Sequence, residues 1–142
     1  MTTRRATAEW KGGLRDGVGE IALESGAFRG PYSFKSRFEG GGDTNPEELV
    51  GAAHAGCFTM ALAATLQQAG HAPTRIRTEA AVRIEKVGDG FSITRIDLKT
   101  EGQVPGIDAA TFQSFAEKAK ATCPLSKALA GTDIHLEAKL QS

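Results

Sequence analysis

The chain has 142 residues, enough for a single hydrophobic core, so we expect residues 1–142 to form one domain. Its 17 Lys and Arg residues balance its 17 Asp and Glu residues. Because nucleic acids and anionic membranes attract basic surfaces, this balance argues against both as partners. Small neutral or apolar ligands fit the composition better.

The N-terminus lacks the apolar core and the small-residue cleavage site of a secretory signal. No apolar run is expected to reach the roughly 18 residues that span a bilayer, so we expect a cytoplasmic protein without a membrane partner. Reducing conditions keep most thiols free, so Cys57 and Cys123 are not expected to form a permanent disulfide. A catalytic, metal-binding or merely buried role is open for each.

The first part of the chain alternates strand-like segments with glycine turns, and it predicts strands over 7–11, 18–23 and 32–38. The glycines at 40–42 then form a flexible loop, too short for a domain linker.

A long helix is predicted over 45–69. Asn45 can cap it, Pro46 suits its first position, and the acidic Glu47 and Glu48 favour the positive end of the helix dipole. Its interior is nearly free of charge and rich in small residues, so we expect protein to surround this central helix on most sides.

The rest of the sequence predicts two strands, over 75–86 and 91–100, with a bulge or twist in the second. A helix capped by Asp108 follows, and its apolar stripe consists of Phe112, Phe115, Ala116 and Ala119. A short helix over 125–130 leads to a last strand, whose inward-facing residues are Ile134, Leu136, Ala138 and Leu140. This order is typical of an α+β fold with an antiparallel sheet.

The two cysteines occupy different settings. Cys57 lies in a mostly apolar helix, where a cysteine is usually a small buried hydrophobe. Apolar burial raises the pKa of a thiol, so a reactive Cys57 needs a cation from outside the helix. Cys123 precedes Pro124 at a helix start, where N–H groups without partners favour thiolate. Local physics alone predicts Cys123 as the more acidic thiol, although it could simply cap a turn.

His54 lies three residues before Cys57, on an adjoining helix face. It could be a base, a hydrogen-bond donor, a metal ligand or a satisfied structural group. With Cys57 and Cys123 it would offer three zinc ligands, but the sequence lacks the two close ligand pairs that make zinc motifs specific. No metal is therefore expected.

Four motifs, in this order, resemble the signatures of the OsmC/Ohr family: Arg37-Phe38-Glu39-Gly40, Thr44-Asn45-Pro46-Glu47-Glu48-Leu49, Gly51-Ala52-Ala53-His54-Ala55-Gly56-Cys57-Phe58 and Cys123-Pro124-Leu125-Ser126. The resemblance covers nearly the whole chain. His54, the Arg37 segment and Pro105-Gly106-Ile107-Asp108 look more like the OsmC branch than the Ohr branch.

The resemblance implies an OsmC-like α+β fold with a long central helix, an intimate homodimer, and a peroxidase that reduces organic hydroperoxides without a cofactor in stress responses. It implies that Cys57 attacks the peroxide and Cys123 resolves the product, which reverses the local ranking. It assigns the activating cation to Arg37 and its carboxylate partner to Glu47, with His54 as an auxiliary candidate. An external dithiol, of lipoyl type in the family, would recycle the cysteines.

Ten residues separate Glu47 from Cys57, about 15 Å along a helix, which excludes direct contact within one helix. We expect a composite site, formed across a dimer interface or through a bent first turn. Two other functions stay open. One is a cysteine hydrolase or acyl transferase that uses His54 as the base. The other is a non-enzymatic stress protein that binds ligands in an apolar pocket and senses redox state.

Overall fold

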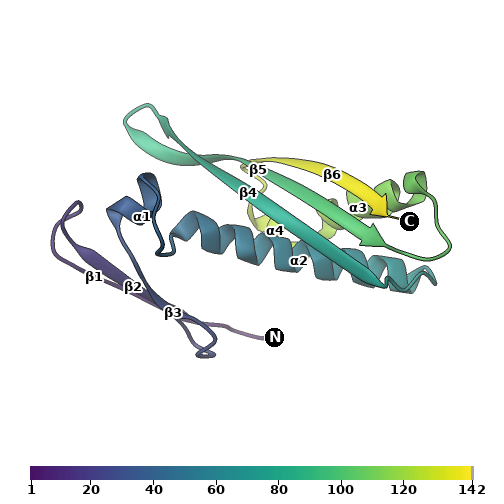
Figure 1. Cartoon of the computed structure of the whole chain (residues 1–142), viewed down its shortest axis with the longest axis horizontal. Coiled ribbons are helices and arrows are strands. Elements are labelled where there is room, and N and C mark those ends of the chain that lie inside the picture. Colours follow the sequence, from purple (N-terminus) through teal and green to yellow (C-terminus); the bar gives the residue numbers. More distant parts are fainter. Residues whose placement is uncertain (142) are drawn as a thin grey trace. The chain divides into compact units, whose positions relative to one another are not determined.

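The computed structural model describes residues 1–141. They divide into two compact units, one formed by Met1–Leu49 and the other by the described chain from Val50 onward. Each unit has its own three-stranded sheet, and the architecture is α+β, as the sequence predicts (Figure 1). That residues 1–142 act as one domain stays a prediction.

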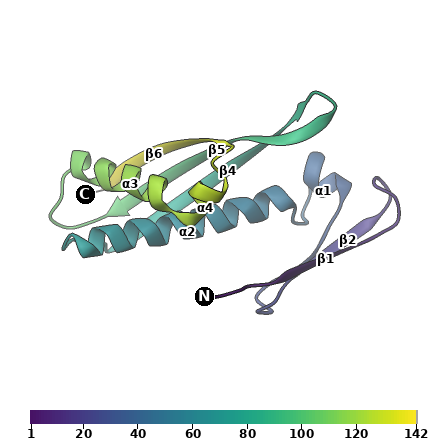
Figure 2. The ribbon, with the colours of Figure 1, turned by 180° about the vertical axis from the view of Figure 1, so that it is seen from behind.

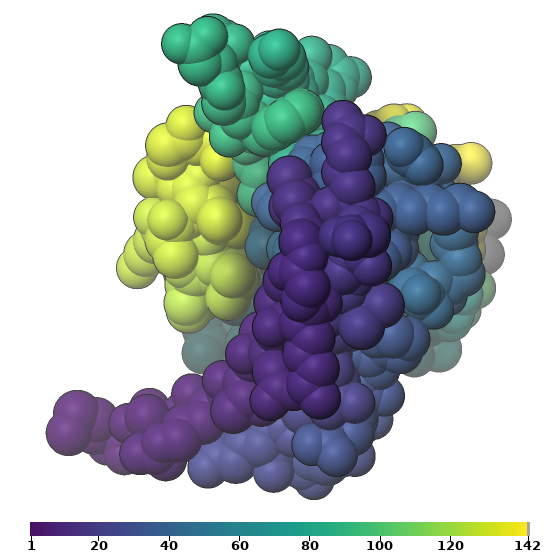
Figure 3. Space-filling view, turned by 90° about the vertical axis from the view of Figure 1, so that its left-hand side faces the viewer, coloured from purple at the N-terminus to yellow at the C-terminus, as the bar shows by residue number. Residues whose placement is uncertain are grey.

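The N-terminal unit is built on an antiparallel sheet in the order β1-β2-β3. Its strands are β1 (Ala6–Lys11), β2 (Val18–Leu23) and β3 (Arg29–Tyr32). Figure 3 shows the surface of this unit in a space-filling view, with its first residues in purple. The predicted strands over 7–11 and 18–23 are confirmed within one residue at each end.

The predicted strand over 32–38 is wrong, because the short helix α1 (Phe34–Phe38) occupies most of it. The cause is a capping box. The Ser33 hydroxyl accepts a hydrogen bond from the backbone N–H of Ser36, while the Ser36 hydroxyl accepts one from the backbone N–H of Ser33. Two reciprocal bonds start a helix that the apolar pattern alone did not reveal, and this helix carries Arg37.

The long helix α2 (Pro46–Gln68) begins as predicted, with the Asn45 side chain accepting a hydrogen bond from the Glu48 backbone N–H at 2.8 Å. The elements that follow are β4 (Arg75–Val87), β5 (Gly90–Gln103), α3 (Ala109–Thr122), α4 (Pro124–Ala128) and β6 (Asp133–Gln141). In both ribbon views, α2 and α3 lie on the same side of the β4-β5-β6 sheet (Figures 1 and 2).

The second sheet is mixed rather than purely antiparallel. β4 and β5 form the predicted antiparallel hairpin, with the expected irregularity in register where Thr94 is the extra residue opposite Arg83 and Ile84. The last strand departs from the prediction, because β6 runs parallel to β5. The connection through α3 and α4 returns the chain to the end of the sheet where β5 began, as a helical crossover does.

The core of the second unit lies between its helices and its sheet. One stripe of α2, with Phe58, Leu62 and Leu66, is fully buried together with Ile96 and Leu98 of β5. The predicted stripe of α3 is confirmed at its buried members Phe112, Ala116 and Ala119.

The expectation that protein surrounds α2 on most sides is wrong for a single chain. Ala52, Ala53, Gly56 and Met60 are exposed, and the Met60 exposure is 76%. The expectation that no segment has the length and composition of a membrane span is also wrong, since α2 has a mean hydropathy of 1.6 over its most apolar window. The core helix of a soluble protein can have the same length and composition. What distinguishes α2 is that one of its apolar faces is exposed in the single chain.

We expect Gly102→Ala in β5 to lower the free energy of unfolding by about 1–3 kcal/mol, the cost of overpacking a core. A Cβ at Gly102 would lie 2.5 Å from Cε1 of the fully buried Phe112 ring. Gly90→Ala in the same strand is the control, because its Cβ would meet no atom within 4 Å among the described residues. Chemical denaturation of both variants checks the prediction, and equal losses would contradict it.

Candidate active site

In the N-terminal unit, Arg37 and Glu47 form an ion pair between α1 and the first turn of α2. Arg37 Nη2 donates to Glu47 Oε1 at 2.8 Å, and Nε donates to the same oxygen at 3.1 Å. The Glu47 side chain is only 8% exposed, whereas that of Arg37 is 38% exposed. A buried carboxylate thus holds a guanidinium that still reaches the surface.

Ser36 and Asn45 hold the two ends of this ion pair in place. The Ser36 hydroxyl donates to the Thr44 carbonyl at 2.8 Å, and the Asn45 side-chain amide donates to the Ser36 carbonyl at 3.1 Å. These bonds join the residue before Arg37 to the loop before Glu47. The two hydrogen bonds therefore fix the position of the ion pair, although the loop between α1 and α2 is rich in glycine.

Aromatic side chains surround a cavity of about 250 Å³ beside Arg37 in the same unit. Its lining includes Trp10, Leu14, Tyr32, Phe34 and Phe38. The Trp10 and Tyr32 rings meet edge to face with centroids 5.4 Å apart, and the Phe38 ring lies 5.3 Å from the Arg37 guanidinium carbon. The ion pair therefore borders an apolar hollow.

In the second unit, Cys57 of α2 and Cys123 at the start of α4 are brought together. Their sulfur atoms lie 3.0 Å apart, and both cysteines are reduced. Cys123 is fully buried, whereas Cys57 is partly exposed. The side chains are thus placed to form a disulfide with a small movement, because S–S bonds are about 2 Å long.

The two thiols differ in acidity. Burial raises the pKa of Cys57, and its hydrogen bond with Cys123 raises it further. Burial would also raise the pKa of Cys123, but the neighbouring polar groups of Cys57, of Ser126 and of the Leu125 backbone lower it overall. The Cys123 side chain makes no capping hydrogen bond in α4. The directions of the two shifts agree with the local prediction that Cys123 is the more acidic thiol.

His54 is fully buried, and within the described residues its hydrogen-bond partner is Ser126 rather than Cys57. Its Nε2 lies 2.9 Å from the Ser126 hydroxyl, and its Nδ1 has no hydrogen-bond partner among residues 1–141. Burial lowers its pKa, which keeps the ring neutral near pH 7. Within the described chain, no three His, Cys, Asp or Glu residues are grouped as a metal ion would require.

Sequence reasoning gave no separate role to Ser126, whose hydroxyl lies 2.9 Å from Nε2 of His54. Ser126 also helps to lower the pKa of Cys123. A signal was present in the spacing. Ser126 follows Cys123 by three residues at a helix start, and the side chain at the third helical position reaches back toward the N-cap residue.

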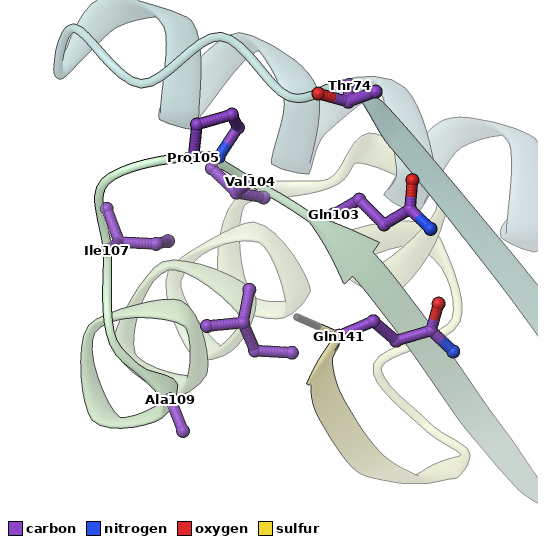
Figure 4. Close-up of a pocket in the computed structure, with 8 residues that line it drawn as sticks. Thr74, Gln103, Val104, Pro105, Ile107, Ala109 and Gln141 are labelled. Atoms are coloured by element: carbon purple, nitrogen blue, oxygen red, sulfur yellow. The ribbon is translucent and has the colours of Figure 1, made fainter.

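A separate cavity of about 550 Å³ lies at the ends of β5 and β6 and contains none of the predicted site residues (Figure 4). Gln103 and Gln141 are paired neighbours in the sheet and place their amides along its rim.

The fold is shared with solved structures of known type. An organic hydroperoxide resistance protein from Elizabethkingia anophelis, solved with thiocyanate bound, is 26% identical and superimposes with a TM-score of 0.77. The match covers 100% of this chain and 97% of that one. The fold is therefore that of the OsmC/Ohr class of α+β proteins.

Comparison of the sequence with known proteins identifies the family within this fold class. Peroxiredoxin OsmC of Escherichia coli (strain K12) is 50% identical over 140 residues, which cover 98% of this chain and 97% of that protein. The organic hydroperoxide resistance protein of Xanthomonas axonopodis pv. citri (strain 306) is 37% identical over 93 residues, 65% of this chain and 63% of that protein. A model of the OsmC-like protein family matches residues 39–139, and the chain belongs to this family. It is a peroxidase, with a peroxide-related redox function.

The buried His54 gives stability a defined dependence on pH. In the unfolded chain this ring titrates near its ordinary pKa of about 6.5, whereas in the folded protein burial lowers that pKa. Below about pH 6.5 the unfolded chain binds a proton that the folded protein does not, so the protein becomes less stable as the pH is lowered. We expect the free energy of unfolding to fall more steeply between about pH 7 and pH 5 in the wild type than in His54→Gln. Denaturant titrations at each pH measure both slopes, and equal slopes would contradict the assignment.

Proposed function

We propose that this peroxidase reduces organic hydroperoxides to alcohols through the thiols of Cys57 and Cys123. The observation that carries the proposal is the 3.0 Å contact between two reduced sulfurs, one partly exposed and one fully buried. A partly exposed cysteine can meet a substrate, whereas a fully buried one can react only with a neighbouring group such as Cys57.

In the proposed cycle, the Cys57 thiolate attacks the terminal oxygen of the hydroperoxide and breaks the O–O bond. Cys57 becomes a sulfenic acid, and the alkoxide leaves and takes a proton to become an alcohol. The Cys123 thiolate then attacks the Cys57 sulfur, forming a disulfide and releasing hydroxide, which is protonated to water. An external dithiol, of the lipoyl type in this proposal, reduces the disulfide by exchange and is itself oxidised.

Arg37 is proposed to supply the cation that Cys57 needs. The pKa of Cys57 is raised by burial and by its partner thiol, so attack at neutral pH requires positive charge. The Arg37 guanidinium meets Glu47 through its Nε and Nη2 edge, which turns the opposite edge away from the carboxylate. That edge would stabilise both the thiolate and the developing alkoxide.

The organic part of the substrate is proposed to occupy the aromatic cavity beside Arg37. A lining of Trp10, Tyr32 and Phe34 rewards burial of an alkyl or aryl group, which hydrogen peroxide does not offer.

The assembly is proposed to be a homodimer. The exposed apolar face of α2, with Ala52, Gly56 and Met60, supports burial against a second copy, because apolar helix faces of this kind are usually covered. We place the protein in the cytoplasm, where a dithiol pool can recycle it.

Cysteine substitutions test the proposed roles. We expect Cys57→Ser to abolish reduction of cumene hydroperoxide, because no other residue makes the attack. Cys123→Ser should consume about one equivalent and then stop, because the sulfenic acid forms but cannot be resolved. Peroxide consumption is measured with and without a dithiol. Single-equivalent consumption by Cys57→Ser would assign the attack to the other thiol.

Arginine substitutions test the cation. We expect Arg37→Ala to raise the pKa of Cys57 and slow its attack, and Arg37→Lys to restore part of the rate, since lysine keeps the charge but loses the planar fork. Arg95→Ala is a matched control, because Arg95 holds Asp97 with the same 2.8 Å contact and a side-chain exposure of 37%. Thiol alkylation rates across pH give the Cys57 pKa. If Arg37→Ala and Arg95→Ala behave alike, Arg37 has no part in activation.

A further inference from the structure

The turn between β1 and β2, residues 12–17, carries an arginine whose charge is not neutralised. Within the described residues, Arg15 makes no ion pair with a carboxylate. Its guanidinium carbon lies 4.5 Å from the centroid of the Phe34 ring instead. Phe34 belongs to α1 and lines the aromatic cavity of about 250 Å³. An arginine with an open charge therefore stacks on a wall of the cavity where we place the organic part of the substrate.

Hydrogen bonds fix the backbone of this turn. The indole Nε1 of Trp10 donates to the Gly13 carbonyl at 3.2 Å, and the backbone N–H of Gly17 donates to the same carbonyl at 2.8 Å. A Cβ at Gly17 would collide with that carbonyl oxygen, so the close approach requires glycine. The position of Arg15 therefore does not depend on a loosely held loop.

The same turn brings an apolar side chain to the cavity. Leu14 lines it, although 67% of this residue is exposed. A large apolar side chain that is exposed beside an aromatic cavity gains free energy when a ligand covers it. The turn thus supplies one apolar and one cationic side chain next to each other.

The charges around the cavity favour an anionic ligand. Arg37 also lines the cavity, but Glu47 holds it in an ion pair at 2.8 Å. Arg15 is therefore the arginine whose charge a ligand can still neutralise. A ring covers at most one side of a guanidinium, so N–H donors remain for a carboxylate, which matches their planar fork.

The size of the cavity limits the organic part of that ligand. A volume of about 250 Å³ corresponds to roughly eight water molecules at about 30 Å³ each. Sites for drug-sized ligands usually start at about 300 Å³. One ring or a short branched chain therefore suits the cavity better than a long alkyl chain.

We propose that Arg15 is a specificity-determining residue that binds a carboxylate on the organic part of the hydroperoxide. The preferred substrates are then compact anionic organic hydroperoxides with one ring or a short branched chain. This inference rests on the proposed function, in which the aromatic cavity takes the organic part of the substrate.

Binding of an unreactive analogue tests the charge of Arg15 without any peroxide chemistry. Trp10 is the single tryptophan of the chain and lines the cavity, so its fluorescence reports occupancy. The two probes are para-isopropylbenzoate and its neutral counterpart para-isopropylbenzamide. We expect Arg15→Gln to weaken binding of the benzoate about fivefold, the effect of an exposed ion pair, and to leave binding of the benzamide unchanged.

The matched control is Arg4→Gln. It removes an arginine from the same unit that is also exposed, makes no ion pair within residues 1–141 and does not line the aromatic cavity. Equal affinities for the benzoate in Arg15→Gln and Arg4→Gln would overturn the proposal.

Two further measurements separate charge from apolar contact. Leu14→Ala should weaken binding of both probes alike, because it removes apolar surface and no charge. Raising the salt concentration from about 0.1 M to about 1 M shortens the Debye length from about 10 Å to about 3 Å, so it should weaken benzoate binding more in the wild type than in Arg15→Gln. Equal salt dependence in both proteins would contradict recognition by Arg15.

The corresponding kinetic test compares cumene hydroperoxide with its para-carboxyl derivative. We expect the ratio of their kcat/KM values, carboxyl over neutral, to fall about fivefold in Arg15→Gln and to stay unchanged in Arg4→Gln. An unchanged ratio in Arg15→Gln would contradict the proposal. Failure of the proposed function looks different, since the wild type would then consume neither hydroperoxide, while the fluorescence of Trp10 still tests carboxylate binding.

Discussion

The contact between the sulfurs of Cys57 and Cys123 is the interaction on which the chemistry of this protein depends. The two residues are 66 positions apart, and their sulfurs meet at 3.0 Å. The contact requires that α2 and α4 lie on the same side of one sheet, and the crossover from β5 through α3 and α4 to β6 brings this about. The parallel pairing of β6 is therefore part of the reason that a resolving thiol reaches Cys57.

The pair is electrostatically asymmetric. Within the second unit the surroundings stabilise a thiolate on Cys123 and disfavour one on Cys57. If acidity alone decided which sulfur reacts first, the buried one would attack, yet it has no access to a substrate. The proposed resolution is that access selects Cys57 and that Arg37 supplies the missing charge. The low pKa of Cys123 then serves the second step, in which a thiolate is also needed.

The sequence predicted the elements with strong local signals. Asn45 and Asp108 cap their helices as expected, because an Asx side chain at a helix start has few alternatives. It failed where a long-range or reciprocal contact decided. The Ser33–Ser36 capping box turned a predicted strand into α1, and the direction of β6 depends on a crossover whose path no local pattern encodes. The exposed face of α2 was missed because composition does not say which faces one chain covers.

The sequence predicted the main residues of the candidate site but not the residue that supports them. The Arg37–Glu47 pair and the thiol pair were named from motifs, and each pair is in contact. Ser126 was not, since a serine is common in the first turn of a helix and only the fold reveals that its hydroxyl meets the buried His54. Residues whose role is to hold another residue leave little trace in a single sequence.

We propose that Cys57 takes the oxygen first, although its surroundings raise its pKa and those of Cys123 lower the pKa of that thiol. Wild-type protein exposed to less than one equivalent of cumene hydroperoxide, in the presence of a reagent that captures sulfenic acids, should carry the captured group on Cys57 when its peptides are analysed by mass spectrometry. Capture on Cys123 instead would contradict the account, because it would mean that acidity rather than access decides which sulfur attacks.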